Sequence, residues 1–399
     1  MKVLFVSTSI PPATDMQTTR NMYLIQSMIE RGYDVDIITC VEEGEIDYQF
    51  NRILSPLTIY RTNKPMVLRW HNFINRRGSG IIKKIHNVLI NYVAIPDLYV
   101  GWNFSATKLI KNEKLFDYDI MITSSVSYTA HMVGHEWKKL TNRKWVAEYG
   151  DPWGLDENGH IRKTNAAIEK RIISNCDGFV FTTQATIRAY EKYYNVDIPY
   201  CLVPCGYENI IEDIKGKSDG KIRFMYTGIA YKRARNLSNI IDVLGKQSKG
   251  KMTLVGTVSD DFKKMCEVYE NIEYTGRVPY NESLSLIASA DVLVHIGNFG
   301  TMQVPGKTYI YLSSKKPILY IKQQLKNDPT SEVLERFSGV LICNNTMEEI
   351  ASAVQELLEN YEKYKLLAEE RSKTLLIEEY KWDNLGKTFV DFMEECIKR

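Results

Sequence analysis

The sequence predicts an α/β protein with two domains, each built on a doubly wound parallel sheet. Short apolar runs of strand length alternate with stretches of helical period along most of the chain. A polar, glycine-bearing stretch at 206–221 interrupts this alternation, which then starts again. The 399 residues are enough for two domains of ordinary size, each with its own core.

The first predicted domain covers residues 1–205. A strand-like run opens it, and the stretch from Thr18 to Arg31 then carries apolar residues at helical spacing and ends at Gly32. A strand, a helix and a second strand in direct succession form a βαβ unit, which requires parallel strands. Strand-like runs lie at 2–9, 33–40, 116–125, 143–151, 177–183 and 199–204.

The second predicted domain covers residues 222–378, and 206–221 is its linker to the first. The chain after Met347 is helical in character. We expect the last helix, 379–399, to pack back on the first domain with Trp382 as its anchor. Strand-like runs of the second domain lie at 222–228, 251–256, 271–276, 290–297, 317–322 and 340–345.

Composition and simple motifs exclude several classes of function. A net charge of +2 is too balanced for nucleic-acid binding through the general field of the protein. The seven cysteines are dispersed and contain no Cys-x-x-Cys pair, which fits reduced thiols in a cytoplasmic protein. Neither G-x-G-x-x-G nor G-x-x-x-x-G-K-[ST] is present, so neither a dehydrogenase nor a P-loop enzyme is supported. His131 and His135 have a metal-binding spacing, but without a third ligand we expect ordinary helix positions.

The segment 64–96 concentrates basic and apolar residues. It reads as an amphipathic helix broken at Gly78 and Gly80. One interpretation is a peripheral surface that lies on anionic lipid without crossing the bilayer. The other is a solvated helical insertion beside the cleft between the domains, and the sequence favours neither.

A Pro-Gly-Lys step at 305–307 opens a short predicted helix directly before the strand at 317–322. The free N–H groups of a helix start attract anions, and a glycine lets a phosphate approach the backbone. Gly306 and Lys307 therefore either hold a phosphate or form a turn with a solvated lysine.

Taken together, the motifs resemble the retaining glycosyltransferases of the GT-B fold, family four. Their order and spacing carry the resemblance over nearly the whole chain, and the GDPW element resembles a subgroup often used in bacterial cell-surface polysaccharide assembly. The pieces include KVLFVSTSIPP, WVAEYGDPWG, LVPCGYE, YTGRVPYNESLSLIASADVLVHIG and PGKTYIYLSSKKPIL.

The resemblance implies two Rossmann-like domains that face each other across a cleft. The first would bind a lipid-linked or polysaccharide acceptor, and the second a nucleoside-diphosphate sugar, which is the donor substrate. The sugar would be transferred with retention, and no metal or other cofactor is implied. Protein cations would offset the charge of the leaving diphosphate instead.

Individual residues follow from the same resemblance. Asp151, Arg235 and Lys307 are the implied catalytic residues, with Asp151 positioning a substrate unless it only forms an Asx turn before Pro152. On the acceptor side we expect Arg20 and Trp153, whose alternatives are a solvated helix surface and a core position. The resemblance places a basic residue of one loop against the diphosphate, and Lys232 is an alternative to Arg233 and Arg235 for that position. The implied donor-binding residues are Gly228, Arg233, Arg235, Gly306, Lys307, Thr308, Tyr309 and Tyr311.

The sequence departs from the family pattern at one place. Ile310 stands where family members usually carry a glutamate that binds the ribose hydroxyls, and Met302 stands at an earlier position that is often acidic. Two alternatives therefore stay open: a non-catalytic partner subunit of the same fold, which Ile310 favours, and a nucleotide-sugar 2-epimerase, which Ile310 disfavours.

Overall fold

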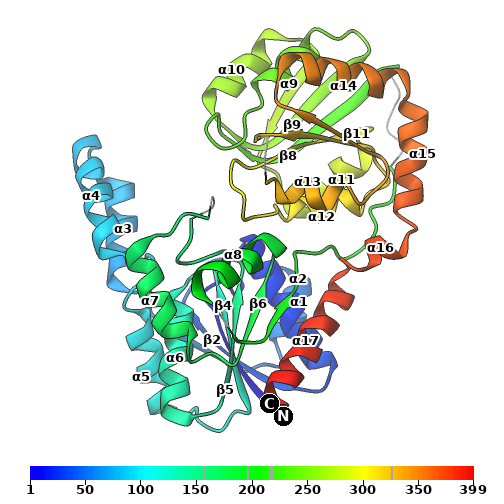
Figure 1. Cartoon of the computed structure of the whole chain (residues 1–399). Helices are drawn as coiled ribbons and strands as arrows, with labels where there is room; N and C mark the ends of the chain where they lie inside the picture. The colour runs from blue at the N-terminus through cyan, green and yellow to red at the C-terminus, as the bar shows by residue number, and fades with distance from the viewer. Residues whose placement is uncertain (157–158, 196, 215–219, 325–326) are drawn as a thin grey trace. The chain divides into compact units, whose positions relative to one another are not determined.

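The computed structural model describes residues 1–156, 159–195, 197–214, 220–324 and 327–399 (Figure 1). The chain divides into two compact units. Unit 1 comprises Met1–Pro204 and Trp382–Arg399, and unit 2 comprises Cys205–Lys381. Part of the predicted linker, 215–219, lies outside the described residues. Each unit contains one parallel sheet, so the predicted α/β fold class is confirmed.

Unit 1 contains a seven-stranded sheet in the order β3-β2-β1-β4-β5-β6-β7, with parallel neighbours throughout. The strand order reverses between β1 and β4, which makes this pair the switch point of the sheet, where ligands bind beyond the carboxyl ends of the strands. The strands are β1 (Lys2–Val6), β2 (Asp34–Cys40), β3 (Ile59–Thr62), β4 (Ile120–Ser125), β5 (Lys144–Tyr149), β6 (Gly178–Phe181) and β7 (Tyr200–Leu202).

Helices cover the sheet of unit 1, and the C-terminal helix is one of them. Helix α17 packs on α1, where Trp382 stacks on Tyr23 with 5.1 Å between ring centroids. Gly386 lets the two helices approach closely, because any Cβ at this position would collide with the Ser27 hydroxyl. The helices are α1 (Met16–Glu30), α2 (Tyr48–Leu54), α3 (Met66–Arg77), α4 (Gly80–Val93), α5 (Trp102–Asn112), α6 (Thr129–Thr141), α7 (Lys163–Ile173), α8 (Gln184–Tyr194) and α17 (Trp382–Lys398).

The predicted amphipathic segment forms a helical hairpin, α3–α4, between β3 and α5. Helix α3 ends before Gly78, and Ser79 caps α4 by accepting a hydrogen bond from the Ile82 N–H. The hairpin projects away from the sheet of unit 1 (Figure 1). Within the part of the chain that the structure describes, we find no helix with the length and apolar character needed to cross a bilayer.

Unit 2 contains a six-stranded parallel sheet in the order β10-β9-β8-β11-β12-β13. Its switch point lies between β8 and β11. Strand β11 is buried over its whole length because apolar layers cover both faces of the sheet, and Val292 and Leu293 point into opposite layers. The strands are β8 (Ile222–Ala230), β9 (Gly250–Val258), β10 (Ile272–Gly276), β11 (Val292–Ile296), β12 (Ile318–Lys322) and β13 (Val340–Asn344).

The helices of unit 2 supply these two layers. Helix α14 packs on α9 and β13 on one side of the sheet, whereas α12 contributes buried residues to the other layer. The helices are α9 (Ser238–Gly245), α10 (Asp260–Val268), α11 (Tyr280–Ser289), α12 (Lys307–Leu312), α13 (Pro329–Leu334), α14 (Met347–Glu359), α15 (Tyr361–Arg371) and α16 (Leu375–Glu378).

Candidate functional site

Two cations meet at the switch point of unit 2, and we call Lys307 and Arg235 the switch-point cations. Lys307 begins α12, which follows β11, and its Nζ donates to the Thr227 carbonyl of β8 at 3.1 Å. Arg235 lies in the loop after β8, and its Nε donates to Oδ1 of Asn298, which follows β11, at 2.8 Å. Each side chain therefore crosses from one side of the switch point to the other.

The switch-point cations lie close enough to repel each other. The Lys307 Nζ is 4.0 Å from the centroid of the Tyr226 ring, over whose face a cation is stabilised. Burial lowers the pKa of Lys307 well below its usual value, and the charge of Arg235 lowers it further. Among the described residues, no carboxylate pairs with either cation. The two side chains are nevertheless partly exposed, so the arrangement is suited to an anionic ligand.

A glycine leaves the space beside the Lys307 ammonium open. Gly228 has a φ of +122°, which side chains rarely tolerate, and a Cβ there would lie 3.8 Å from Lys307 Nζ. Gly228 pairs with Gly256 of β9, where a Cβ would collide with the Gly228 carbonyl oxygen. The two glycines therefore let the strand ends approach each other and keep the ammonium uncovered.

The other predicted donor-binding residues of α12 point inward. Thr308 is fully buried, with its Oγ1 2.8 Å from Nε2 of His295, and Tyr309 packs on Tyr380 in the core. The Tyr311 hydroxyl accepts the Thr227 N–H at 2.9 Å. The expectation that Thr308, Tyr309 and Tyr311 contact the donor is therefore corrected: they anchor α12, because one side of this short helix is core.

The remaining predicted positions lie around the same corner. Gly306 directly precedes α12 with ordinary helical dihedral angles, and α12 itself spans only six residues. Arg233 is exposed in the loop that also carries Arg235, as is Lys232. Ile310 packs against the apolar layer of α12, so no acidic group replaces the expected glutamate at that position. Asn298 went unnoticed in the sequence, although a polar residue just after a strand beside a switch point is a usable signal.

On the acceptor side, the structure corrects both interpretations of Arg20. The side chain is neither solvated nor available to a ligand, since it is 1% exposed and its Nε pairs with Glu148 Oε1 at 2.7 Å. Its Nη1 donates to the Pro204 carbonyl, and Gln17 donates to the second oxygen of Glu148 at 2.8 Å. Arg20 and Glu148 therefore form a buried ion pair that ties α1 to the end of β5. The sequence analysis did not single out Glu148, although it is a carboxylate near the end of an otherwise mostly apolar strand-like run.

The two candidate residues of the GDPW element differ in exposure: Asp151 can be reached from solvent, whereas Trp153 cannot. Asp151 is partly exposed after β5, and its charge adds to the effect of burial in raising the pKa of Tyr128. Trp153 is fully buried and stacks on Tyr128 with 5.6 Å between ring centroids. Because that ring is inaccessible, the expected acceptor-side role of Trp153 is corrected to its alternative, a core position. Asp151 stays a candidate.

The two spaced histidines, His131 and His135, are buried on α6. His131 is fully buried with its Nδ1 2.8 Å from Thr123 Oγ1, and burial lowers its pKa to about 3. His135 is also buried. The described residues contain no group of three or more side chains that would hold a metal ion.

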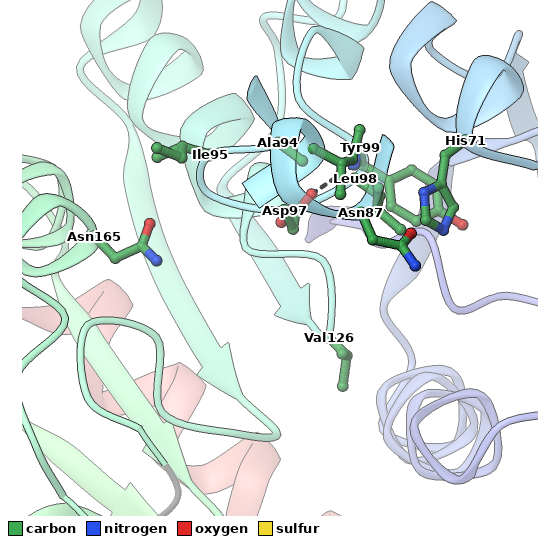
Figure 2. A pocket seen from close by; sticks show the side chains of 10 residues that line it. His71, Asn87, Ala94, Ile95, Asp97, Leu98, Tyr99, Val126 and Asn165 are labelled. Carbon is green, nitrogen blue, oxygen red and sulfur yellow. Dashed lines mark hydrogen bonds between the residues drawn. The ribbon is translucent and has the colours of Figure 1, made fainter. Parts of the chain in front are cut away.

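Unit 1 contains a pocket of about 700 Å³ at the base of the α3–α4 hairpin (Figure 2). Val126, which follows β4, places one wall beyond the carboxyl end of a switch-point strand. Asp97 is held by the Thr129 N–H at 2.9 Å and the Tyr99 N–H at 2.8 Å, and burial raises its pKa. The lining is apolar with a few polar groups, as is usual for a small-molecule site. The lining residues are His71, Asn87, Ile90, Ala94, Ile95, Asp97, Leu98, Tyr99, Val126 and Asn165.

No family model matches the chain. Over 333 residues it is 23% identical to an uncharacterized glycosyltransferase of Methanocaldococcus jannaschii, covering 78% of this chain and 82% of that protein. Its structure is similar to that of sucrose-phosphate synthase from Thermosynechococcus elongatus, with a TM-score of 0.73, 12% identity, and coverage of 100% of this chain and 99% of the other.

A second solved structure is the Anabaena HepE protein in complex with UDP. It matches with a TM-score of 0.69 and 12% identity, covering 99% of this chain and all of the other. The fold is GT-B. Each Rossmann-like unit of this GT-B protein has its own switch point. The switch-point cations lie at that of unit 2, and the pocket borders that of unit 1.

Proposed function

We propose that the protein is a retaining glycosyltransferase. It moves a sugar from a nucleoside-diphosphate sugar, bound by unit 2, to a lipid-linked or polysaccharide acceptor, bound by unit 1, in bacterial cell-surface glycan synthesis. The observation that carries this proposal is the pair of cations at a switch point with no carboxylate beside them among the described residues. The name of the relative in Methanocaldococcus jannaschii supports sugar transfer, and the UDP complex of HepE supports a nucleotide-containing donor.

A diphosphate fits the switch-point cations through its charge. Lys307 and Arg235 repel each other, and an anion with charge on two phosphates removes this repulsion. Burial strengthens the effect because a charge in a low-dielectric site interacts more strongly than one in water. The planar guanidinium of Arg235 is already oriented by Asn298.

The proposed reaction uses the same cations. As the bond between the anomeric carbon and the phosphate oxygen breaks, negative charge grows on the diphosphate, and Lys307 and Arg235 stabilise it. The acceptor hydroxyl oxygen bonds to the anomeric carbon from the same face, and its proton passes to the departing diphosphate. Asp151 positions a substrate and does not act as the base. The two fixed cations supply the charge that a metal would otherwise supply.

The pocket at the base of the hairpin is our candidate for the acceptor. Its apolar walls suit the apolar part of a lipid-linked acceptor, whereas Asn87 and Asn165 offer hydrogen bonds to a sugar. Asp97 shapes the wall, because its carboxylate already accepts hydrogen bonds from the backbone and side chain of Thr129.

Two measurements test the proposal. Calorimetric titration with a panel of nucleoside diphosphates should show binding to at least one of them. Mass spectrometry of the chain incubated with common sugar nucleotides should then show hydrolysis or transfer, with release of the diphosphate. Absence of binding across the panel would refute the donor site and favour a non-catalytic partner subunit, the alternative that Ile310 supports. Release of a 2-epimer would instead identify an epimerase.

A further inference from the structure

The outer face of the α3–α4 hairpin is apolar. On α4, large apolar side chains recur at helical spacing on the side that faces solvent, whereas His86 is buried and contacts His71 of α3, with 3.1 Å between ring nitrogens. Among the described residues of unit 1, nothing covers this apolar stripe. Its exposed members are Ile81, Ile82, Ile85, Val88, Leu89, Tyr92 and Val93.

Helix α3 adds exposed aromatic side chains. Trp70 is 58% and Phe73 is 50% exposed, and their ring centroids lie 6.2 Å apart. Met66, one turn earlier, is 83% exposed. A soluble domain rarely leaves so many large apolar groups on one projecting element, so this surface requires a partner.

The charge of the hairpin indicates which partner. Residues 64–93 contain six basic residues and no acidic residue, in a chain whose net charge is only +2. Lys64 pairs with Glu42 at 2.7 Å, outside the hairpin. In the described part of the chain, the other five form no ion pair: Arg69, Arg76, Arg77, Lys83 and Lys84.

We propose that the α3–α4 hairpin docks on the surface of an anionic lipid bilayer. Its apolar side chains enter the boundary between headgroups and acyl chains, and its basic side chains contact lipid phosphates. Trp70 and Tyr92 are of the type that collects at this boundary. A second copy of the chain is a poor occupant, because it would bring the same uncompensated positive charge to the interface. The inference concerns location and does not depend on the sugar-transfer proposal.

Vesicle sedimentation of the full chain tests the role of charge. The protein should sediment with phosphatidylcholine vesicles that contain phosphatidylglycerol and should stay in solution with phosphatidylcholine alone. Lys83→Ala combined with Lys84→Ala should lower the partition coefficient about 25-fold, at about fivefold for each basic residue. The matched control, Lys246→Ala with Lys249→Ala on the surface of unit 2, should leave partitioning unchanged.

A second pair of variants tests the apolar face. Val88→Ser combined with Leu89→Ser should weaken partitioning tenfold or more, because the side chains that enter the bilayer are lost. Both residues are exposed, so the fold should not suffer. Val268→Ser with Leu366→Ser removes two side chains of unit 2 that are at least as exposed and should have no effect.

Trp70 provides a direct reporter. All six tryptophans lie in the described part of the chain, and the other five are buried. Anionic vesicles should therefore shift the fluorescence of Trp70 to the blue, and Trp70→Phe should remove this shift while sedimentation persists. Equal binding to neutral vesicles, binding that the hairpin variants leave intact, or a dimer that Val88→Ser with Leu89→Ser converts to monomer would overturn the proposal.

Discussion

Replacing Lys307 with methionine separates a ligand-binding cation from a structural one. Methionine retains most of the length and packing of the lysine stem but removes the charge. If the Lys307 ammonium contacts the diphosphate, the variant loses a charge-assisted hydrogen bond of about 1.5–3 kcal/mol. The dissociation constant for the nucleoside diphosphate should therefore rise by about 10- to 150-fold.

The stability of the free protein should respond in the opposite direction. Lys307 is partly desolvated and repelled by Arg235, so removal of its charge relieves a penalty in the folded state. We expect the free energy of unfolding of Lys307→Met at pH 7 to equal or exceed that of the wild type. A lysine in a buried structural ion pair would instead cost about 3–5 kcal/mol when removed.

The pH dependence follows from the lowered pKa of Lys307. Between this pKa and the unfolded value of about 10.4, the unfolded chain binds a proton that the folded protein does not, so stability rises with pH. Nucleotide affinity should fall over the same window as the ammonium is lost, and Lys307→Met should show neither trend. Calorimetry and urea denaturation measure both quantities, with Lys249→Met as an exposed control. Unchanged affinity in Lys307→Met would refute the donor site.

Three further predictions concern other parts of the molecule. Gly228→Ala should cost about 1–3 kcal/mol of stability through backbone strain and should weaken nucleoside-diphosphate binding measured by calorimetry. The control Gly220→Ala is also at a positive φ but in open space, and it should leave this affinity unchanged. Arg20→Met should lower the free energy of unfolding, measured in urea, by about 3–5 kcal/mol because it leaves the buried Glu148 carboxylate unpaired. The double variant Arg20→Met with Glu148→Gln should recover part of this loss, and strictly additive losses would contradict the pairing. Burial lowers the pKa of His131 to about 3, so between that value and the unfolded value of about 6.5 only the unfolded chain binds the proton, and stability should fall by about 1.4 kcal/mol for each unit of decreasing pH. Urea titrations at successive pH values should show that His131→Gln removes this contribution, and an unchanged slope in the variant would contradict it.

The fold class could be predicted because its signals are local. Strand-like runs such as the one at 290–297 are apolar at consecutive positions, since Val292 and Leu293 face opposite apolar layers. Alternation of such runs with helical spacing implies parallel strands and crossover helices without knowledge of any long-range contact.

The candidate site could be predicted only in part. Lys307 and Arg235 were identified by resemblance, and the structure brings both to the switch point of unit 2. The orientation of Thr308 and Tyr309 could not be read from the sequence, because it depends on which side of α12 meets the core. Trp153 was misassigned for the same reason: its burial depends on packing against Tyr128.

The sequence by itself determined the alternation of strands and helices and the acid-free basic hairpin, because periodicity and local charge depend on neighbours within a few residues. Only the tertiary structure decided that Arg20 pairs with Glu148, 128 residues away, and that two cations lie together with no carboxylate partner among the described residues. Such pairings depend on the order and register of strands that are distant in the chain, and their energies depend on burial, which no local pattern specifies.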